Sequence, residues 1–201
     1  LSEAYTRKID ELNPDGVFIL DKPIVSDEFI DYCNEKGLPI IWVDHHPLQP
    51  QSLKELKEKN VFYYNPLYSK EESNEPTSYL CYNIVGNKSD MWVGFLGCLG
   101  DHYIPEFTEE FSKNYKDLLE KKMTSSEMLY KTEIGRLSKI LSFALKDRTS
   151  NITKMLKKLW NVKSPYEILN DDSFTFILNR YHEINKKYVE LLEKAEEQVS
   201  K

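Results

Sequence analysis

Apolar runs alternate with amphipathic stretches in the first third of the chain. Residues 26–37, opening on Ser26 as a candidate N-cap, and the shorter stretch 48–60 both carry helical patterns. Three continuous apolar runs predict buried strands: GVFIL (16–20), PIIWV (39–43) and VFYYN (61–65). The alternation of strand and helix is typical of a parallel sheet with helices on its faces.

The pattern changes after the third strand. Residues 66–76 are polar and aperiodic, which predicts a loop, and two helices are expected at 77–86 and 90–101. The second helix carries Gly94, Gly97 and Gly100 at a spacing of three. Because glycines weaken a helix, we expect another segment to pack close to that backbone.

Only helical patterns follow residue 106. They cover 107–122, 124–146, 150–160, 164–170 and 173–199. The last of them has an apolar stripe that needs a packing partner: Ile177, Tyr181, Ile184, Tyr188, Leu191 and Ala195. The predicted fold class is therefore α/β, with a parallel sheet and flanking helices in residues 1–105 and an all-helical region in 106–201.

Composition narrows the functional classes. The chain has 201 residues, 40% of them hydrophobic and 30% charged, which is ordinary for a globular protein. A net charge of -6 argues against coating nucleic acid by bulk attraction. The three cysteines form no CxxC pair and predict a reducing, cytoplasmic location. The apolar segment 91–100 is too short to span a bilayer, so no membrane partner is expected.

Polar side chains follow the first two predicted strands. Asp21 comes directly after the first, and Asp44, His45 and His46 come directly after the second. Ligands of parallel α/β sheets bind at the carboxyl ends of the strands, and carboxylate with imidazole suits manganese, zinc or iron. Pro47 favours an extended His46, which gives the two imidazoles different directions. The alternatives are a turn or cap role for Asp21 and an exposed loop for the histidines.

These motifs resemble those of the DHH phosphoesterase superfamily, in its RecJ-like branch. The triplet Asp44, His45 and His46 matches the motif that names the family, VFILDKP places Asp21 after the preceding strand, and GFLGCLGDHYIP places Asp101 after a glycine-rich helix. The stretches NPLYSKEESNEPTSYLCYNI and LYKTEIGRLSKILSF also resemble that branch.

The resemblance implies a two-metal site. Asp21 would bridge two divalent ions, usually Mn²⁺ with Mg²⁺ as a possibility, and His45 and Asp101 would be further metal ligands. His46 would contact the substrate phosphate, and Asp44 would orient a histidine. Two such ions convert a bound water into hydroxide and neutralise the charge on the phosphoryl oxygens.

The chain also departs from the family pattern. The first acidic motif, of the type DHxDxD, should precede Asp21, but Asp10 and Asp15 are the only aspartates there and neither follows an apolar strand. The family's C-terminal substrate-binding domain is missing as well. Either upstream and C-terminal segments of the same protein complete the site, which the first residue Leu1 favours, or one metal position has been lost.

A basic stretch bears on the substrate. Residues 131–163 contain nine Lys or Arg against Glu133 and Asp147, and a basic helical wall facing the metal site would attract single-stranded nucleic acid. The alternative is a solvated helix face. Phe143 and Trp160 are the aromatic residues of this region, and both are predicted at core positions.

The function expected from these features is a metal-dependent phosphodiesterase or exonuclease acting on single-stranded nucleic acid or short oligonucleotides. One alternative is a phosphoesterase for a small compound such as a cyclic dinucleotide, nucleoside bisphosphate or polyphosphate. Another is a non-catalytic binding module. His102 and His182 are weaker candidates, and both are compatible with a surface role.

Overall fold

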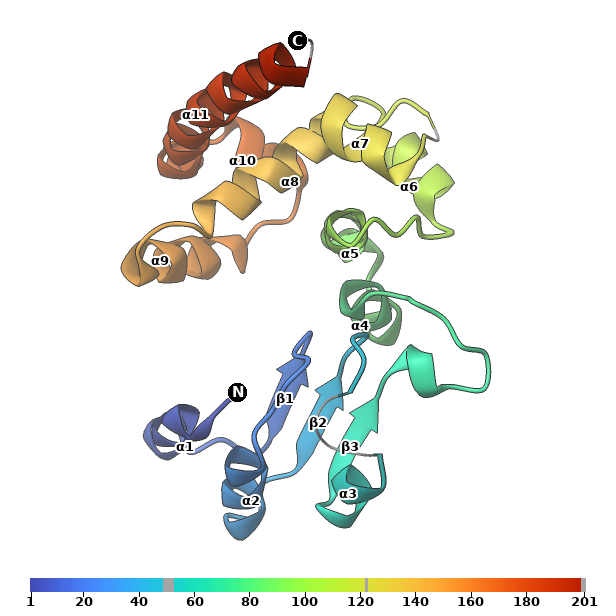
Figure 1. Cartoon of the computed structure of the whole chain (residues 1–201), viewed down its shortest axis with the longest axis vertical. Coiled ribbons are helices and arrows are strands. Elements are labelled where there is room, and N and C mark those ends of the chain that lie inside the picture. Colours follow the sequence, from blue (N-terminus) through green and yellow to red (C-terminus); the bar gives the residue numbers. More distant parts are fainter. Residues whose placement is uncertain (49–52, 122, 200–201) are drawn as a thin grey trace. The chain divides into compact units, whose positions relative to one another are not determined.

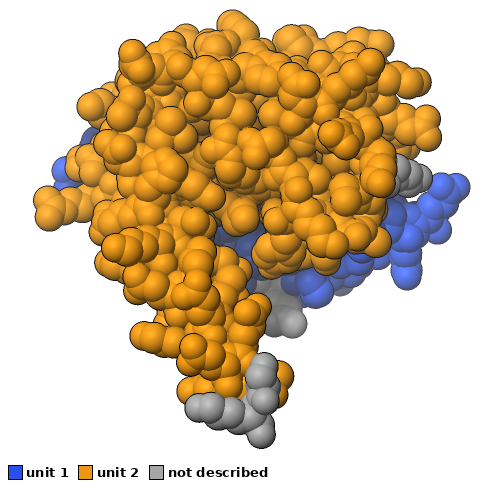
Figure 2. All heavy atoms as spheres, turned by 90° about the horizontal axis from the view of Figure 1, so that it is seen from above, with its two compact units in different colours: residues 1–84 blue, residues 85–201 orange. Residues whose placement is uncertain are grey.

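The computed structural model describes residues 1–48, 53–121 and 123–199. The chain divides into two compact units, residues 1–84 and residues 85–201, which Figure 2 colours separately. The division falls between Ile84 and Val85, at the end of helix α4 (Thr77–Val85), whereas the sequence pattern becomes purely helical after residue 106.

The first unit is built on a three-stranded parallel sheet (Figure 1). Its strands are β1 (Val17–Leu20), β2 (Ile40–Val43) and β3 (Val61–Tyr64), in the order β1-β2-β3. The register pairs Val17 with Ile40 and Ile40 with Val61, so the three strands end level with one another. The prediction of three parallel strands is confirmed.

Helices connect the strands. Helix α2 (Asp27–Glu35) follows β1, and the Ser26 side chain caps it by accepting a hydrogen bond of 3.3 Å from the backbone of Phe29. Helix α3 (Leu53–Glu58) follows β2, within the predicted range 48–60, of which residues 49–52 lie outside the described residues. The 3₁₀ turn η1 (Glu3–Tyr5) and helix α1 (Thr6–Leu12) were not predicted from the sequence. Helix α1 has no buried residue, so its sequence carries no apolar stripe that would indicate a helix.

The sheet has one covered face and one exposed face. The hydrophobic core lies on the covered face: Ile19, Ile40, Trp42 and Val61 of the sheet pack with Val25, Phe29, Ile30, Cys33 and Leu56. On the other face large side chains reach solvent: Phe18 is 69%, Leu20 49%, Ile41 36%, Phe62 62% and Tyr64 48% exposed. The prediction of buried strands therefore holds for one face of the sheet.

The segment after β3 is more ordered than predicted. The 3₁₀ turn η2 (Pro66–Tyr68) begins directly after Asn65, whose side chain accepts a hydrogen bond from the backbone of Leu67. Proline in the first turn fits this start, since its missing N–H would have no partner there. Helix α4 (Thr77–Val85) then forms where a helix was expected.

Every secondary-structure element in the described part of the second unit is a helix, as predicted for the residues after 106. Its elements are η3 (Lys88–Asp90), α5 (Met91–Gly100), α6 (Thr108–Asn114), α7 (Ser125–Lys131), α8 (Glu133–Ala144), α9 (Thr149–Leu159), α10 (Pro165–Asn170), η4 (Asp172–Phe174) and α11 (Thr175–Val199). No described helix of either unit combines the length and apolar character needed to cross a bilayer.

Two long helices of the prediction are shorter or divided. The helix expected at 107–122 ends at Asn114, where Tyr115 leaves the helical conformation (φ -132°, ψ 55°). Leu118 and Leu119 then lie in the core, at 3% and 1% exposure. The Ser112 hydroxyl holds this segment by donating to the Leu119 carbonyl at 2.7 Å.

The helix expected at 124–146 is divided at Thr132. Its backbone is extended there (φ -120°, ψ 163°), and its side chain caps α8 by accepting from the backbone of Gly135. A Cβ atom on Gly135 would lie 2.2 Å from the Leu129 carbonyl oxygen of α7. The glycine therefore allows α7 and α8 to meet at close range, which a continuous helix would prevent.

Three further expectations concern side-chain burial. The stripe of α11 is buried only at its start, at Ile177 and Tyr181, whereas Leu191 is 66% exposed. A Cβ atom on Gly100 would meet nothing within 4 Å, so the close approach expected for that glycine is wrong. Phe143 is buried as predicted, at 9% exposure, but Trp160 is 87% exposed and its predicted core position is wrong.

Candidate metal site

Asp21 occupies a tight turn at the carboxyl end of β1. Its backbone N–H donates to the Val43 carbonyl at 3.1 Å, which extends the pairing with β2 by one residue. Its φ of 54° lies in the left-handed region, which aspartate tolerates better than most residues. The Trp42 indole donates to the Lys22 carbonyl at 3.0 Å and fixes the next residue of the turn. The aspartate side chain is thus presented by a constrained backbone.

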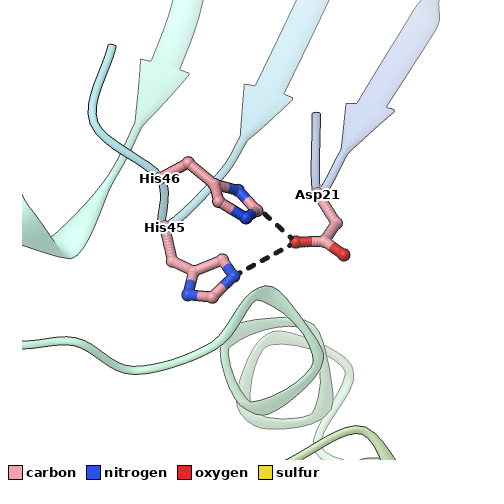
Figure 3. A group of neighbouring side chains, drawn as sticks. All are labelled: Asp21, His45 and His46. Atoms are coloured by element: carbon pink, nitrogen blue, oxygen red, sulfur yellow. Dashed lines mark ion pairs between the residues drawn. The ribbon is translucent and has the colours of Figure 1, made fainter. Parts of the chain in front are cut away.

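The two histidines follow β2 and reach the same aspartate. Figure 3 shows both imidazoles turned toward one carboxylate oxygen of Asp21. His45 Nε2 lies 3.3 Å from Asp21 Oδ1, and His46 Nδ1 lies 3.9 Å from the same oxygen. The His45 side chain is 15% exposed, whereas the side chains of His46 and Asp21 are 41% and 56% exposed. One partly buried and two accessible groups therefore converge at the strand ends.

Asp44 supports this arrangement from below the surface. It is 1% exposed, its backbone N–H donates to the Tyr64 carbonyl of β3, and its Oδ1 lies 2.9 Å from His46 Nδ1. This contact with a buried carboxylate fixes the orientation of the His46 ring. The contact between Asp44 and a histidine, which the resemblance implies, is present, and the histidine is His46.

The donor set fits a divalent metal ion. Ligand atoms of Asp21, His45 and His46 all lie within 4.8 Å of one another, and His45 Nε2 is buried with no hydrogen-bond partner among the described residues. Two atoms bound to one ion at about 2.1 Å, with an angle near 100°, lie roughly 3.2 Å apart. The observed 3.3 Å between His45 Nε2 and Asp21 Oδ1 matches the spacing of adjacent ligands. The structure thus groups three of the five predicted site residues in this cluster, and Asp44 directly behind it.

Asn65 positions the site, and the sequence analysis missed this role. It follows β3, is 4% exposed, and its amide donates to the His46 carbonyl at 2.7 Å and to the Tyr63 hydroxyl at 2.8 Å. Burial raises the pKa of Tyr63 to about 12, so the phenol stays neutral beside the buried Asp44. The available signal was a polar residue at the end of the third apolar run, the same pattern that identified Asp21 and Asp44.

A cysteine of α4 also responds to the charge of the cluster. Burial and, second, the negative charge of Asp21 raise the pKa of the Cys81 thiol. The thiol is therefore protonated at neutral pH, and it lies within electrostatic range of the carboxylate.

The remaining candidates lie in the second unit. Asp101 is the exposed residue that ends α5, and its backbone N–H donates to the Gly97 carbonyl. Its membership of the metal site stays a prediction. His102 is exposed with φ 57°, which fits a helix-ending turn, and His182 is exposed on α11 with its ring 5.4 Å from that of Tyr181.

Comparison of the chain with protein-family models, curated proteins and solved structures gives no match. The geometry of the cluster and the sequence motifs are therefore the features from which a function can be inferred.

Proposed function

We propose that the Asp21, His45 and His46 cluster is part of the active site of a metal-dependent phosphodiesterase that hydrolyses single-stranded nucleic acid or short oligonucleotides. The observation that carries this proposal is the 3.3 Å spacing of Asp21 Oδ1 and the otherwise unpartnered His45 Nε2 at the carboxyl ends of adjacent parallel strands. The resemblance to the DHH superfamily supports it, and so does the site's position at the carboxyl edge of the sheet.

The proposed role of each side chain follows from its exposure and from its contacts. Asp21 and His45 are the ligands of a divalent ion, for which we favour Mn²⁺ with Mg²⁺ as an alternative. His46, more exposed than His45 and held by Asp44 through Nδ1, is the group that contacts the substrate phosphate. The ion supplies a hydroxide nucleophile and neutralises developing phosphoryl charge.

The proposal includes further carboxylates. One carboxylate and two imidazoles are too little negative charge to hold two divalent ions at close range, and two ions are part of the mechanism that the resemblance implies. We assign Asp101 and acidic residues of an upstream segment to this task, and substrate retention to a C-terminal segment. A cytoplasmic location, where nucleic-acid substrates are present, completes the proposal.

The test combines metal binding with hydrolysis. Mn²⁺ affinity is measured by calorimetry, and release of mononucleotides from an end-labelled single strand is followed with and without Mn²⁺. His45→Ala is expected to abolish both Mn²⁺ binding and Mn²⁺-dependent hydrolysis. His182→Ala, at the exposed histidine of α11, is the matched control and is expected to leave both unchanged.

Other outcomes identify the rival functions. Hydrolysis of a cyclic dinucleotide, with the single strand left intact, would replace the proposed substrate by a small phosphate compound. If a protein that includes the flanking segments bound Mn²⁺ but hydrolysed neither substrate, the rival function of a non-catalytic binding module would be supported. If His45→Ala kept both its Mn²⁺ affinity and its rate of hydrolysis, His45 would not be a metal ligand and the proposed metal site would be rejected.

A further inference from the structure

Helix α9 carries a basic surface with one exposed tryptophan. From residue 148 to residue 163 the chain has five cationic side chains and no acidic one: Arg148, Lys154, Lys157, Lys158 and Lys163. Trp160 ends the helix, and at 87% it is nearly as exposed as a tryptophan can be in a folded chain. Large aromatic side chains on a surface are most often part of a binding interface.

The tryptophan belongs to a regular face of the helix. Trp160 lies three residues after Lys157 and four after Leu156, and Lys157 lies four after Thr153; all four residues are exposed. On the opposite face Met155 is buried, at 2% exposure. The Trp160 backbone N–H donates to the Leu156 carbonyl at 3.1 Å, so the ring is carried by ordered helical backbone.

The cations on α9 divide into two groups. Lys158 donates to the Ser173 carbonyl at 2.6 Å and lies over the ring of Phe174, and Lys154 lies over the ring of Phe176, so both are held by neighbouring elements. Lys157 forms no ion pair with an acid among the described residues. It stands three residues before Trp160, within about 6 Å on a helix surface.

We propose that Lys157 and Trp160 form a stacking platform for single-stranded nucleic acid, with a base lying on the indole and the adjacent phosphate on the lysine. Unpaired bases stack on exposed aromatic rings, and a basic surface follows the backbone of the strand. The choice of ligand rests on the proposed function, but binding at this surface is independent of hydrolysis.

A lipid surface fits these residues less well. Helices that lie in a bilayer interface present a broad apolar face, whereas the apolar face of α9 is turned into the protein. Leu156 and Trp160 are the large apolar side chains left on the outer face, between threonine and lysine. A duplex is also a poor ligand, because its bases are already stacked on one another.

Tryptophan fluorescence gives a direct measurement. The chain has three tryptophans, and Trp42 and Trp92 are 0% and 4% exposed, so an oligonucleotide can reach Trp160 alone. Titration with oligothymidylate is expected to quench the emission in a saturable manner, with an affinity that falls as salt rises. The same titration is run with a duplex and with vesicles of phosphatidylserine and phosphatidylcholine.

Variants separate stacking from charge. Trp160→Ala is expected to weaken binding of a fluorescently labelled strand about 5- to 100-fold, and Trp160→Phe to restore most of that loss. Lys157→Glu is expected to weaken binding and to reduce its salt dependence, whereas Lys116→Glu, at an exposed position between α6 and α7, is the charge-matched control.

Several results would overturn the platform. The first is an equal loss of strand affinity in Lys157→Glu and Lys116→Glu. The second is binding of the duplex with the same affinity as the single strand. The third is a change of Trp160 fluorescence with vesicles but not with the oligonucleotide. Saturable strand binding that depends on Trp160, without hydrolysis of the strand, would retain the platform and reject the proposed function. Hydrolysis of a strand that leaves Trp160 emission unchanged would reject the platform alone.

Discussion

The two units differ in charge as well as in architecture. Residues 1–84 contain eight Lys or Arg and fifteen Asp or Glu, whereas residues 85–201 contain nineteen and eighteen. The first unit places a carboxylate and two imidazoles at the ends of parallel strands, and the second places lysines and a tryptophan on the outer face of a helix. In the proposed function, negative charge that attracts metal ions would repel a polyanionic substrate, and a separate cationic surface would offset that repulsion.

The two sites also differ in how precisely their side chains have to be positioned. Metal ligands have to be held within a few tenths of an ångström, and hydrogen bonds from neighbouring strands fix the backbone at Asp21 and Asp44. A stacking surface tolerates variation in the position of its ligand, since every base has a flat face. A strand end suits the first task and an exposed helix suits the second.

The largest effect is expected from removing the charge of Asp21. Asp21→Asn keeps the left-handed turn, because asparagine tolerates the same backbone, but it loses the charge that holds the ion. Mn²⁺-dependent hydrolysis should fall on the order of 10³-fold, measured by mononucleotide release. Asp15→Asn, before the amino end of the same strand, is the control. Equal rates in the two variants would mean that the carboxyl end of β1 has no special role.

A change in the second unit tests whether the units are independent. Gly135→Ala should destabilise the second unit by roughly 2 to 3 kcal/mol, because its Cβ would overlap the Leu129 carbonyl oxygen. Urea denaturation followed through Trp160 and Trp92 measures this loss, and Gly100→Ala, where a Cβ meets nothing, is the control. Mn²⁺ affinity should stay unchanged. A parallel loss of metal binding would show that the metal site depends on the second unit.

Asp44→Asn is expected to have opposite effects on stability and on metal binding. Asp44 is buried and its Oδ2 has no hydrogen-bond partner among the described residues, so removing its charge should preserve or raise the thermal midpoint. The loss of charge behind His46 should lower Mn²⁺ affinity by about 10- to 100-fold. Calorimetry and thermal denaturation measure the two effects. A drop in the midpoint with unchanged affinity would leave Asp44 a purely structural role.

The smallest effect concerns alkaline pH. Burial raises the pKa of Tyr63 from 10.0 to about 12, so the folded protein retains a proton that the unfolded chain loses. The folded state binds more protons in this window, and the free energy of unfolding therefore falls as pH rises from 10 toward 12. Tyr63→Phe should reduce that slope, measured by urea denaturation at several pH values. An identical slope in both proteins would contradict the burial argument.

Much of the first unit could be predicted from local sequence. Continuous apolar runs identified the strands, and the polar residues directly after two of them identified Asp21, His45 and His46. Asn65 was missed because a single asparagine after a strand is also an ordinary turn residue. Its hydrogen bond to the His46 carbonyl joins residues 19 positions apart, and only the register of β2 and β3 brings them together.

The errors in the second unit have a different cause. Helical periodicity continues through Thr132, but the close contact of α7 and α8 at Gly135 requires a break there. Trp160 follows the apolar positions of α9 in sequence and was therefore predicted to be buried, although it lies on the face opposite Met155. The helical periodicity of apolar residues does not by itself determine which face of a short helix packs against the core.

The left-handed backbone at Asp21 has a consequence for how such a site changes during evolution. Few residue types tolerate φ 54°, and asparagine is among them, at the distance of a single nucleotide change from aspartate. That replacement would preserve the turn while it removes the charge that the proposed metal site requires. Under the proposed function, a single substitution at this position would exchange hydrolysis for binding without loss of the fold.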